Sequence, residues 1–342
     1  MSGSSMMVSA LRFLVVLAAV MPPFTAVAND TSAQMAAGGL VFGKQLGISM
    51  QSEDLYISPD IVRVRYVFHN KTDKDLETIV AFPLPEAAPS SDTGGGHNFY
   101  DGVSANFLNF KTRVDGQPVV TQVEQKALAL GLDRTEILKK YHVPIESYIP
   151  PTDQRSAYHG LSRLTEAQWD ELAALGLLKI DSQGHPSPGW TVATVFYWNQ
   201  VFPAGKDTVI EHEYQPLTGS SFDAPISRKP EDEYAARAMV RYCISGEDTK
   251  AIYELHEGKV DGKAYTAFSE ELGYILKTAA NWSGPINNFH LVIEAREPVD
   301  FAFACLPGLE RKSQSRLEMS QDHFWAFSDL DVLFVISKPL DN

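Results

Sequence analysis

Alternation of apolar and polar residues with a period of two is the feature that most restricts the fold of this chain. Between Val62 and His69 every second side chain is apolar, and Arg63 and Arg65 fall on the opposite face, with Val67 as the exception. A β-strand places successive side chains on opposite faces, so this spacing predicts a strand with one buried and one solvated face. A polar turn follows, and 76–82 returns as a second strand. The segment therefore predicts an antiparallel hairpin.

Strand patterns recur along the chain without the regular alternation of strands and helices that parallel sheets require. The 20 prolines and 23 glycines also favour short strands joined by turns. The sequence predicts a mainly β protein with antiparallel sheets. We expect further strands at 190–198, 208–214, 239–244, 273–278, 289–293, 301–305, 316–319 and 332–336.

The 342 residues are long enough for two domains. We expect a β-sandwich domain at 29–219 and a C-terminal β-rich domain at 220–342, because 218–233 is rich in Gly, Ser, Pro and charge, as linkers are. The C-terminal domain should contain one short helix at 248–256, capped by Asp248.

A helical insertion at about 124–187 is expected to interrupt the first domain. Asp133–Glu136 and Thr165–Gln168 have the spacing of a capping box. The second of these precedes a helical pattern that Gly176 ends.

The first 28 residues have the pattern of a cleavable signal peptide. Arg12 is their one charged residue, an apolar run follows at 13–21, and small residues lead to Ala28. The run is shorter than the roughly 20 residues that a membrane span needs, so an anchoring helix is the weaker alternative. We expect cleavage near Ala28, a periplasmic or secreted location, and no transmembrane segment in the mature chain.

Cys243 and Cys305 are the two cysteines of the chain, and both lie in strand-like segments. In an oxidising compartment an even number of cysteines predicts one disulfide, with two buried thiols as the alternative. The formal net charge of −14 argues against a nucleic-acid partner, because such partners require clustered Lys and Arg.

Local motifs for catalysis, metal binding or cofactor binding are missing. The nine histidines include neither an i, i+4 pair nor an H-E-x-x-H motif, and the sequence has no G-x-S-x-G motif. His212 lies between Glu211 and Glu213, but in a strand these neighbours point to the opposite face. We therefore assign no catalytic residue, metal ligand or cofactor from the sequence.

Aromatic residues are the remaining candidates for ligand contact. Trp190 and Trp198 share one face of a predicted strand with Phe196. An exposed aromatic face could bind a glycan or a partner protein, whereas a sandwich core would give the same pattern and is the preferred interpretation. Trp282 and Trp325 have the same two interpretations.

Two family resemblances accompany these patterns. Val62–Glu86, which ends in Phe82-Pro83-Leu84-Pro85-Glu86, resembles the vault/inter-alpha-trypsin (VIT) domain, a β-sandwich. The chain as a whole resembles the exported bacterial proteins of the domain of unknown function 4424 family. That resemblance rests on several stretches, which include Gly38–Phe42, Ser52–Ser58, Trp198–Pro203, Asn281–Ile286 and Asp329–Leu333. It implies an exported, sheet-rich bacterial protein and transfers no catalytic residue.

The leading functional hypothesis is a non-enzymatic periplasmic protein that binds an envelope protein or glycan. The alternative is a hydrolase that acts on an envelope polymer through a site assembled from residues distant in sequence. An enzyme should have a pocket where His or carboxylate groups converge with perturbed pKa values, and a binding protein should have an exposed surface patch.

Overall fold

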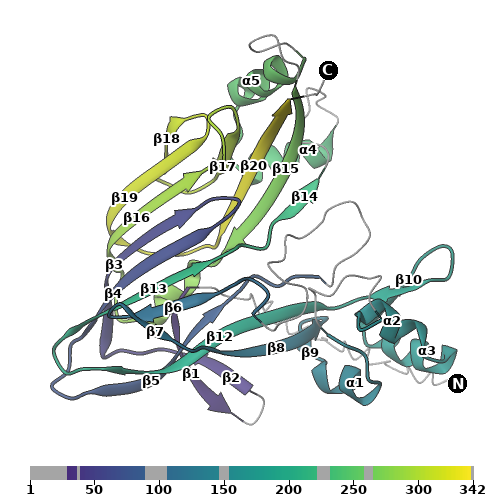
Figure 1. The fold of residues 1–342 in the computed structure, drawn as a ribbon, viewed down its shortest axis with the longest axis horizontal. Coiled ribbons are helices and arrows are strands. Elements are labelled where there is room, and N and C mark those ends of the chain that lie inside the picture. Colours follow the sequence, from purple (N-terminus) through teal and green to yellow (C-terminus); the bar gives the residue numbers. More distant parts are fainter. Residues whose placement is uncertain are drawn as a thin grey trace, which may run out of the picture.

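A computed structural model of the chain describes residues 29–36, 39–88, 106–145, 154–221, 232–257 and 265–339. Strands dominate these residues, which confirms the mainly β fold class (Figure 1). The predicted signal peptide and most of the predicted linker at 218–233 lie outside the described residues.

The largest sheet has eight strands. Both strands predicted at 62–69 and 76–82 are present, but the predicted hairpin is wrong, because Val62–Asn70 pairs in this sheet and Leu76–Pro83 pairs in another. Along the sheet the strands are β18 (Glu310–Ser313), β19 (Arg316–Phe324), β16 (Ile286–Glu294), β3 (Ile48–Ile57), β4 (Val62–Asn70), β13 (Asp207–Tyr214), β6 (Lys111–Val114) and β7 (Gln117–Val119).

A second sheet of six strands packs against the first. Apolar side chains of both sheets meet in one core, where the rings of Phe68 in β4 and Phe202 in β12 lie 5.8 Å apart. This face-to-face packing explains the one-sided alternation in β4 and β13. The strands of the six-stranded sheet are, in order, β2 (Gly39–Gly43), β1 (Thr31–Ala36), β5 (Leu76–Pro83), β12 (Thr191–Phe202), β8 (Gln122–Ala129) and β9 (Leu132–Asp133).

A third sheet has four strands, and its inner strand at 330–339 is buried on both faces. Phe334 faces the main core, and its neighbours Leu333 and Val335 face a smaller core formed with helices α4 (Glu233–Arg241) and α5 (Gly246–Glu257). Burial on both sides accounts for the continuous apolar run at 332–336. The strands are β14 (Gly219–Ser221), β15 (Tyr265–Tyr274), β20 (Leu330–Pro339) and β17 (Phe301–Ala304).

The division expected at 219/220 does not separate the sheets. β3 pairs in parallel with β16 from Ser52↔Asn288 to Ile57↔Ile293, so strands from both sides of the expected boundary share one sheet and one core. This pairing gives β3 a partner on each edge, which a separate N-terminal domain would not provide.

The helical insertion is present and has its own small core, but it begins after β8 and β9, which belong to the six-stranded sheet, and not at about 124 as expected. It contains α1 (Thr135–Lys140), α2 (Ala157–Ser162), α3 (Glu166–Ala174) and a hairpin of β10 (Leu178–Ile180) and β11 (Pro186–Pro188), and lies at one end of the six-stranded sheet (Figure 1). The capping box at Thr165 is confirmed. At α1 the predicted box does not form, because Arg134 is the N-cap and the Asp133 side chain accepts a hydrogen bond from the Thr135 amide instead.

Two predictions in the C-terminal part were wrong. The segment 239–244 was expected to be a strand, but its first residues complete α4, whose buried Ala235 and Ala238 have helical spacing. The segment 273–278 was also expected to be a strand, but β15 ends at Tyr274 and a 3-10 helix follows at Lys277–Asn281. Six-residue windows are too short to distinguish the two periods. The predicted helix at 248–256 is confirmed as part of α5, but the predicted cap is wrong. The helix begins at Gly246, and Asp248 lies in its first turn, where its backbone nitrogen donates to the hydroxyl of Ser245, the residue before the helix.

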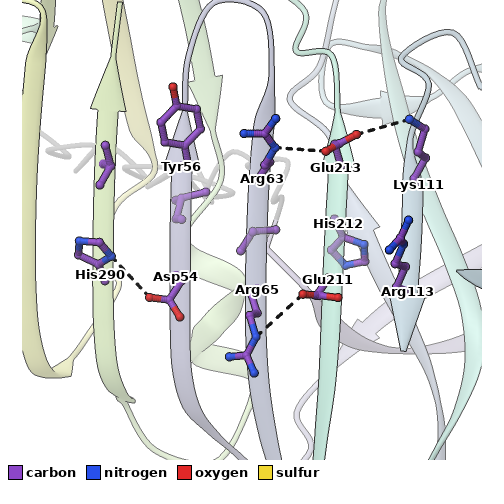
Figure 2. A pocket seen from close by; sticks show the side chains of 13 residues that line it. Asp54, Tyr56, Arg63, Arg65, Lys111, Arg113, Glu211, His212, Glu213 and His290 are labelled. Carbon is purple, nitrogen blue, oxygen red and sulfur yellow. Dashed lines mark hydrogen bonds and ion pairs between the residues drawn. The ribbon is translucent and has the colours of Figure 1, made fainter. Parts of the chain in front are cut away.

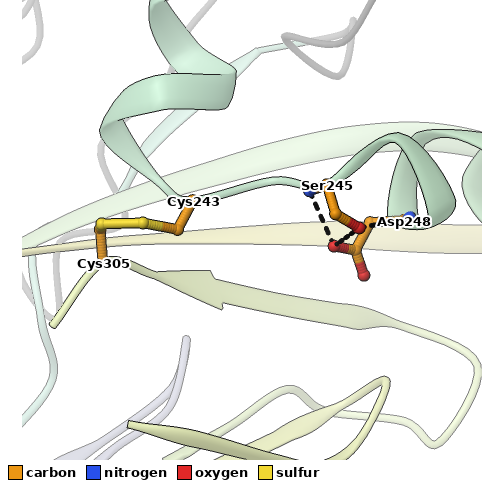
Figure 3. Close-up of a disulfide and its surroundings, with 4 residues drawn as sticks. All are labelled: Cys243, Ser245, Asp248 and Cys305. Carbon is orange, nitrogen blue, oxygen red and sulfur yellow. Dashed lines mark hydrogen bonds between the residues drawn. A yellow bond between two sulfur atoms is a disulfide. The ribbon is translucent and has the colours of Figure 1, made fainter. Parts of the chain in front are cut away.

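The predicted disulfide between Cys243 and Cys305 is present, with 5.0 Å between the Cα atoms (Figure 3). Cys243 follows the end of α4 and has a left-handed backbone with a φ of 54°, so it does not lie in a strand as expected. The bridge joins this turn to the end of β17. Loop-closure entropy over the separation of 62 residues gives about 4 kcal/mol of stabilisation.

Candidate functional site

The outer face of the eight-stranded sheet carries a shallow cavity of about 520 Å³. Side chains of five neighbouring strands, β16, β3, β4, β13 and β6, line it (Figure 2). The site uses the solvated face of the same strands whose other face forms the core.

Strand register arranges the polar side chains in two charged rows across the sheet. The first row places Asp54 between His290 and Arg65, and the second places Arg63 between Tyr56 and Glu213. Directly opposite residues of neighbouring strands have Cβ atoms roughly 5 Å apart, so opposite charges in a row can pair. From β16 to β6, the first row is His290, Asp54, Arg65, Glu211 and Arg113, and the second is Val292, Tyr56, Arg63, Glu213 and Lys111.

Glu213 is the best-bound carboxylate of the charged rows. Its oxygens lie 3.2 Å from Arg63 Nε and 3.4 Å from Lys111 Nζ. The hydrogen bond donated by Arg63 is the main reason why the pKa of Glu213 is lowered. The pairing of Arg65 with Glu211 is looser, with 4.0 Å between Nε and Oε1.

The first row ends on a cation that has no partner among the described residues. The side chain of Arg113 is exposed and makes no hydrogen bond or ion pair with any other described residue. Together the rows hold four cations, Arg63, Arg65, Lys111 and Arg113, against the three carboxylates Asp54, Glu211 and Glu213. This local excess of positive charge stands out on a chain with a net charge of −14. Guanidinium groups bind carboxylates and phosphates through two parallel hydrogen bonds, so the chemistry of this face suits an anionic ligand.

Among the residues that line the cavity, His290 is the one histidine whose side chain opens onto the outer face. Its ring nitrogens lie 3.5 Å from Asp54 Oδ1 and 3.4 Å from Glu318 Oε1. His212 contributes only the inner side of the cavity, because its side chain is fully buried between the sheets, as its position between two outward glutamates predicts.

Two buried carboxyl groups with raised pKa values lie on the opposite side of the sheet from this cavity. One of them, Glu53, is next in sequence to Asp54, which lines the cavity. Asp30 and Glu53 are both fully buried on the inner side, and desolvation raises the pKa of each, that of Glu53 to about 8. The carboxylates that line the outer face, Asp54, Glu211 and Glu213, are exposed to solvent instead.

The aromatic residues predicted as ligand contacts lie in the interior. Trp190, Trp198 and Trp282 are 2%, 3% and 3% exposed. Trp190 packs in the core of the helical insertion, and the other two pack in the main core. This placement matches the core interpretation. Trp325 differs, since it is 49% exposed and lines a second cavity of about 300 Å³ with Phe327.

The sequence indicated the polar face of β4 and β13 but not the site. The outward positions of Arg63, Arg65, Glu211 and Glu213 follow from alternation, whereas the contributions of β3, β6 and β16 depend on which strands become neighbours.

Among the described residues no group of three or more His, Cys, Asp or Glu side chains is arranged to hold a metal ion. In that same part of the chain, no helix is long and apolar enough to cross a membrane.

Comparison with known proteins identifies the family. The model of the family described as domain of unknown function 4424 (DUF4424) matches residues 28–333. The chain belongs to this family. The match extends from the predicted cleavage site into the first residues of β20 and so includes every strand of the charged rows. No curated protein matches this member of DUF4424.

Solved structures give distant similarities. A candidate nutrient-binding protein from Legionella pneumophila aligns with 13% identity and a TM-score of 0.41, over 91% of this chain and 72% of that one. An M1 zinc metallopeptidase from Deinococcus radiodurans aligns with 9% identity and a TM-score of 0.29, over 85% of this chain and 43% of that one. The DUF4424 chain therefore spans less than half of the peptidase.

Proposed function

We propose that this DUF4424 protein is exported and binds an anionic ligand on the charged rows without transforming it. The observation that carries the proposal is the register of β3, β4, β13 and β6, which brings four cations onto one exposed face, one of them with no partner among the described residues. Export is supported by the signal-peptide pattern of residues 1–28 and by the disulfide, which is typical of oxidising compartments.

The spacing of the cations favours an extended ligand with repeated anionic groups. Arg65 and Arg113 lie in one row, two strands apart, which corresponds to roughly 10 Å. The two rows are two residues apart along each strand, or about 7 Å. A carboxylate-bearing glycan, a phosphate-bearing polymer or an acidic protein segment of the cell envelope could place its charges at such intervals.

The test is binding of two probes to the mature protein by calorimetry, oligogalacturonate for carboxylates and a short polyphosphate for phosphates. We expect the double variant Arg65→Gln/Arg113→Gln to weaken binding of the preferred probe at least about tenfold, since each lost charge-assisted contact contributes about 1.5 kcal/mol. The matched control is Arg237→Gln, which removes an exposed arginine of α4 remote from the rows and should change affinity less than about twofold.

The result decides between three outcomes. Preference for one probe identifies the anionic group, and loss of binding in the double variant alone supports the site. Equal affinity of all variants, or no binding of either probe at low salt, contradicts the proposal. Cleaved probe in the recovered sample would instead favour the hydrolase alternative, for which His290 beside Asp54 and Glu318 is the first residue to replace.

A further inference from the structure

The first described residues of the chain lie inside the protein. Asn29 and Asp30 are both 0% exposed, between the inner faces of the sheets and the 3-10 helix. Chain segments next to a removable leader are usually exposed and poorly ordered unless specific contacts hold them. The contacts of Asn29 therefore need a reason.

Asn29 is held at every polar atom. Its backbone nitrogen donates to Thr278 Oγ1 at 2.6 Å, and its carbonyl oxygen accepts from the same hydroxyl at 2.6 Å. Its side-chain amide donates to Glu53 Oε2 at 3.1 Å, while its side-chain oxygen accepts from the hydroxyl of Tyr66. The Glu53 carboxylate therefore contacts the side chain of the same residue whose backbone nitrogen follows the predicted cleavage site.

The acidic groups around Asn29 have unmet bonding capacity. Glu53 Oε1 and Asp30 Oδ2 are buried and have no hydrogen-bond partner among the residues that the structure describes. His212 pairs with the other oxygen of Asp30, with Nε2 at 3.1 Å, and thus leaves Glu53 with no cation. A buried, unpaired carboxyl group is destabilising unless it stays protonated or gains a positive partner.

The sequence supplies such a partner at the right residue, because the predicted signal-peptide cleavage falls between Ala28 and Asn29. We propose that cleavage after Ala28 converts the Asn29 nitrogen into a buried ammonium group that pairs with Glu53 and completes the core. Removal of the leader would then be a step in folding as well as in export. The proposal shares the premise of export with the proposed function but does not depend on ligand binding.

The chemistry is a peptide-bond hydrolysis catalysed by a signal peptidase. Water adds across the Ala28–Asn29 bond, the new carboxylate leaves with the leader, and the new amine takes up a proton. The ammonium keeps the contact with Thr278 Oγ1 and gains two further N–H donors and a positive charge, whereas the amide before cleavage has one donor and no charge. Glu53 can then ionise and accept at the oxygen that lacked a partner.

Cleavage should change how stability depends on pH. While the backbone nitrogen of Asn29 remains part of a peptide bond, burial raises the pKa of Glu53 from 4.5 to about 8. Between these two pH values the folded chain holds a proton that the unfolded chain has lost. Stability should then fall as the pH rises from about 4.5 to about 8. Pairing with the ammonium lowers that pKa and removes the slope. The other titratable groups facing this site are Asp30, with His212 behind it, and the hydroxyls of Tyr66 and Tyr274, whose pKa values are raised well above 10; Asp54 adds a weaker charge from the outer face.

The first experiment is mass spectrometry of the secreted protein, which should begin at Asn29; any other first residue overturns the proposal. The second compares chains that begin at Asn29 and at Ala28, each with Glu53 or with Glu53→Gln, made as carrier fusions that are cut to leave the chosen first residue. With Glu53 present, the added alanine should lower the Tm at pH 7.5 by about 5–10 °C, as expected for loss of a buried ion pair.

Comparison of these four chains separates the effect of charge pairing from steric effects. In the Glu53→Gln background the added alanine should have a much smaller effect, and only the Glu53 chain that keeps Ala28 should lose Tm between pH 5 and pH 8. An equal loss of Tm in both backgrounds, or equal Tm values for the two Glu53 chains, overturns the ion pair. Because ligand affinity is not measured here, failure of this proposal leaves the binding proposal intact, and the reverse also holds.

Discussion

The outer and inner faces of the eight-stranded sheet use the same kinds of residue in opposite ways. Asp54 on the outer face faces His290 at 3.5 Å, and both side chains are exposed to solvent, whereas Asp30 on the inner side faces His212 at 3.1 Å with both side chains fully buried. Water screens the first pair, so it adds little to stability. Water does not reach the second pair, so each partner is the main source of hydrogen bonding and charge compensation for the other. Charge on this sheet therefore favours ligand contact outside and a unique arrangement inside.

The sharpest test of this comparison is to remove the aspartate of each Asp–His pair. Asp30→Ala should destabilise the protein by about 3 kcal/mol, because it leaves His212 Nε2 buried without a partner. Asp54→Ala should change the free energy of unfolding by less than about 0.5 kcal/mol. Urea unfolding of both variants measures the two values, and comparable losses would mean that the faces do not differ.

Two tyrosine hydroxyls provide a smaller, matched comparison. The Tyr66 hydroxyl is buried and bonds Asn29 and the Tyr274 hydroxyl, and the Tyr56 hydroxyl donates to Glu294 at 3.1 Å near the surface. Tyr66→Phe should lower stability by about 1.5 kcal/mol, since it leaves buried partners unpaired. Tyr56→Phe should lower it by a few tenths of a kcal/mol, because water can replace the lost contact. A larger loss for Tyr56→Phe would contradict the assignment of the outer face as solvated.

The smallest expected effect concerns the ion pairs of the charged rows. The lowered pKa of Glu213 means that its contribution to stability is present above about pH 4.5 and is lost as the pH falls below that value. Because 42% of this side chain is exposed, Glu213→Gln should remove only a few tenths of a kcal/mol at pH 7 in low salt. Thermal melts at pH 7 with and without 0.5 M NaCl should show that salt shrinks the difference between the two proteins. A difference that salt leaves unchanged would point to packing instead of charge.

Several features of this protein follow from local sequence. The face on which Arg63, Arg65, Glu211 and Glu213 lie was predicted from period-two alternation alone, since successive side chains of any strand point to opposite sides. The capping box at Thr165 is equally local, because it depends on two residues three positions apart. The pairing of Cys243 with Cys305 needed only an even count of two cysteines and an oxidising compartment.

Other features required the tertiary structure. The parallel pairing of β3 with β16 joins segments more than 200 residues apart, and no local pattern specifies which strand edge meets which. That pairing sets His290 beside Asp54 and so completes the first charged row. Glu53 shares its face of β3 with Leu55 and Ile57, and only the packing of the sheets buries that face. The sequence determined which side chains share a face of each strand, because that depends on backbone geometry within the strand. The tertiary structure decided which strands are neighbours, because pairing energy depends on the burial of the whole core.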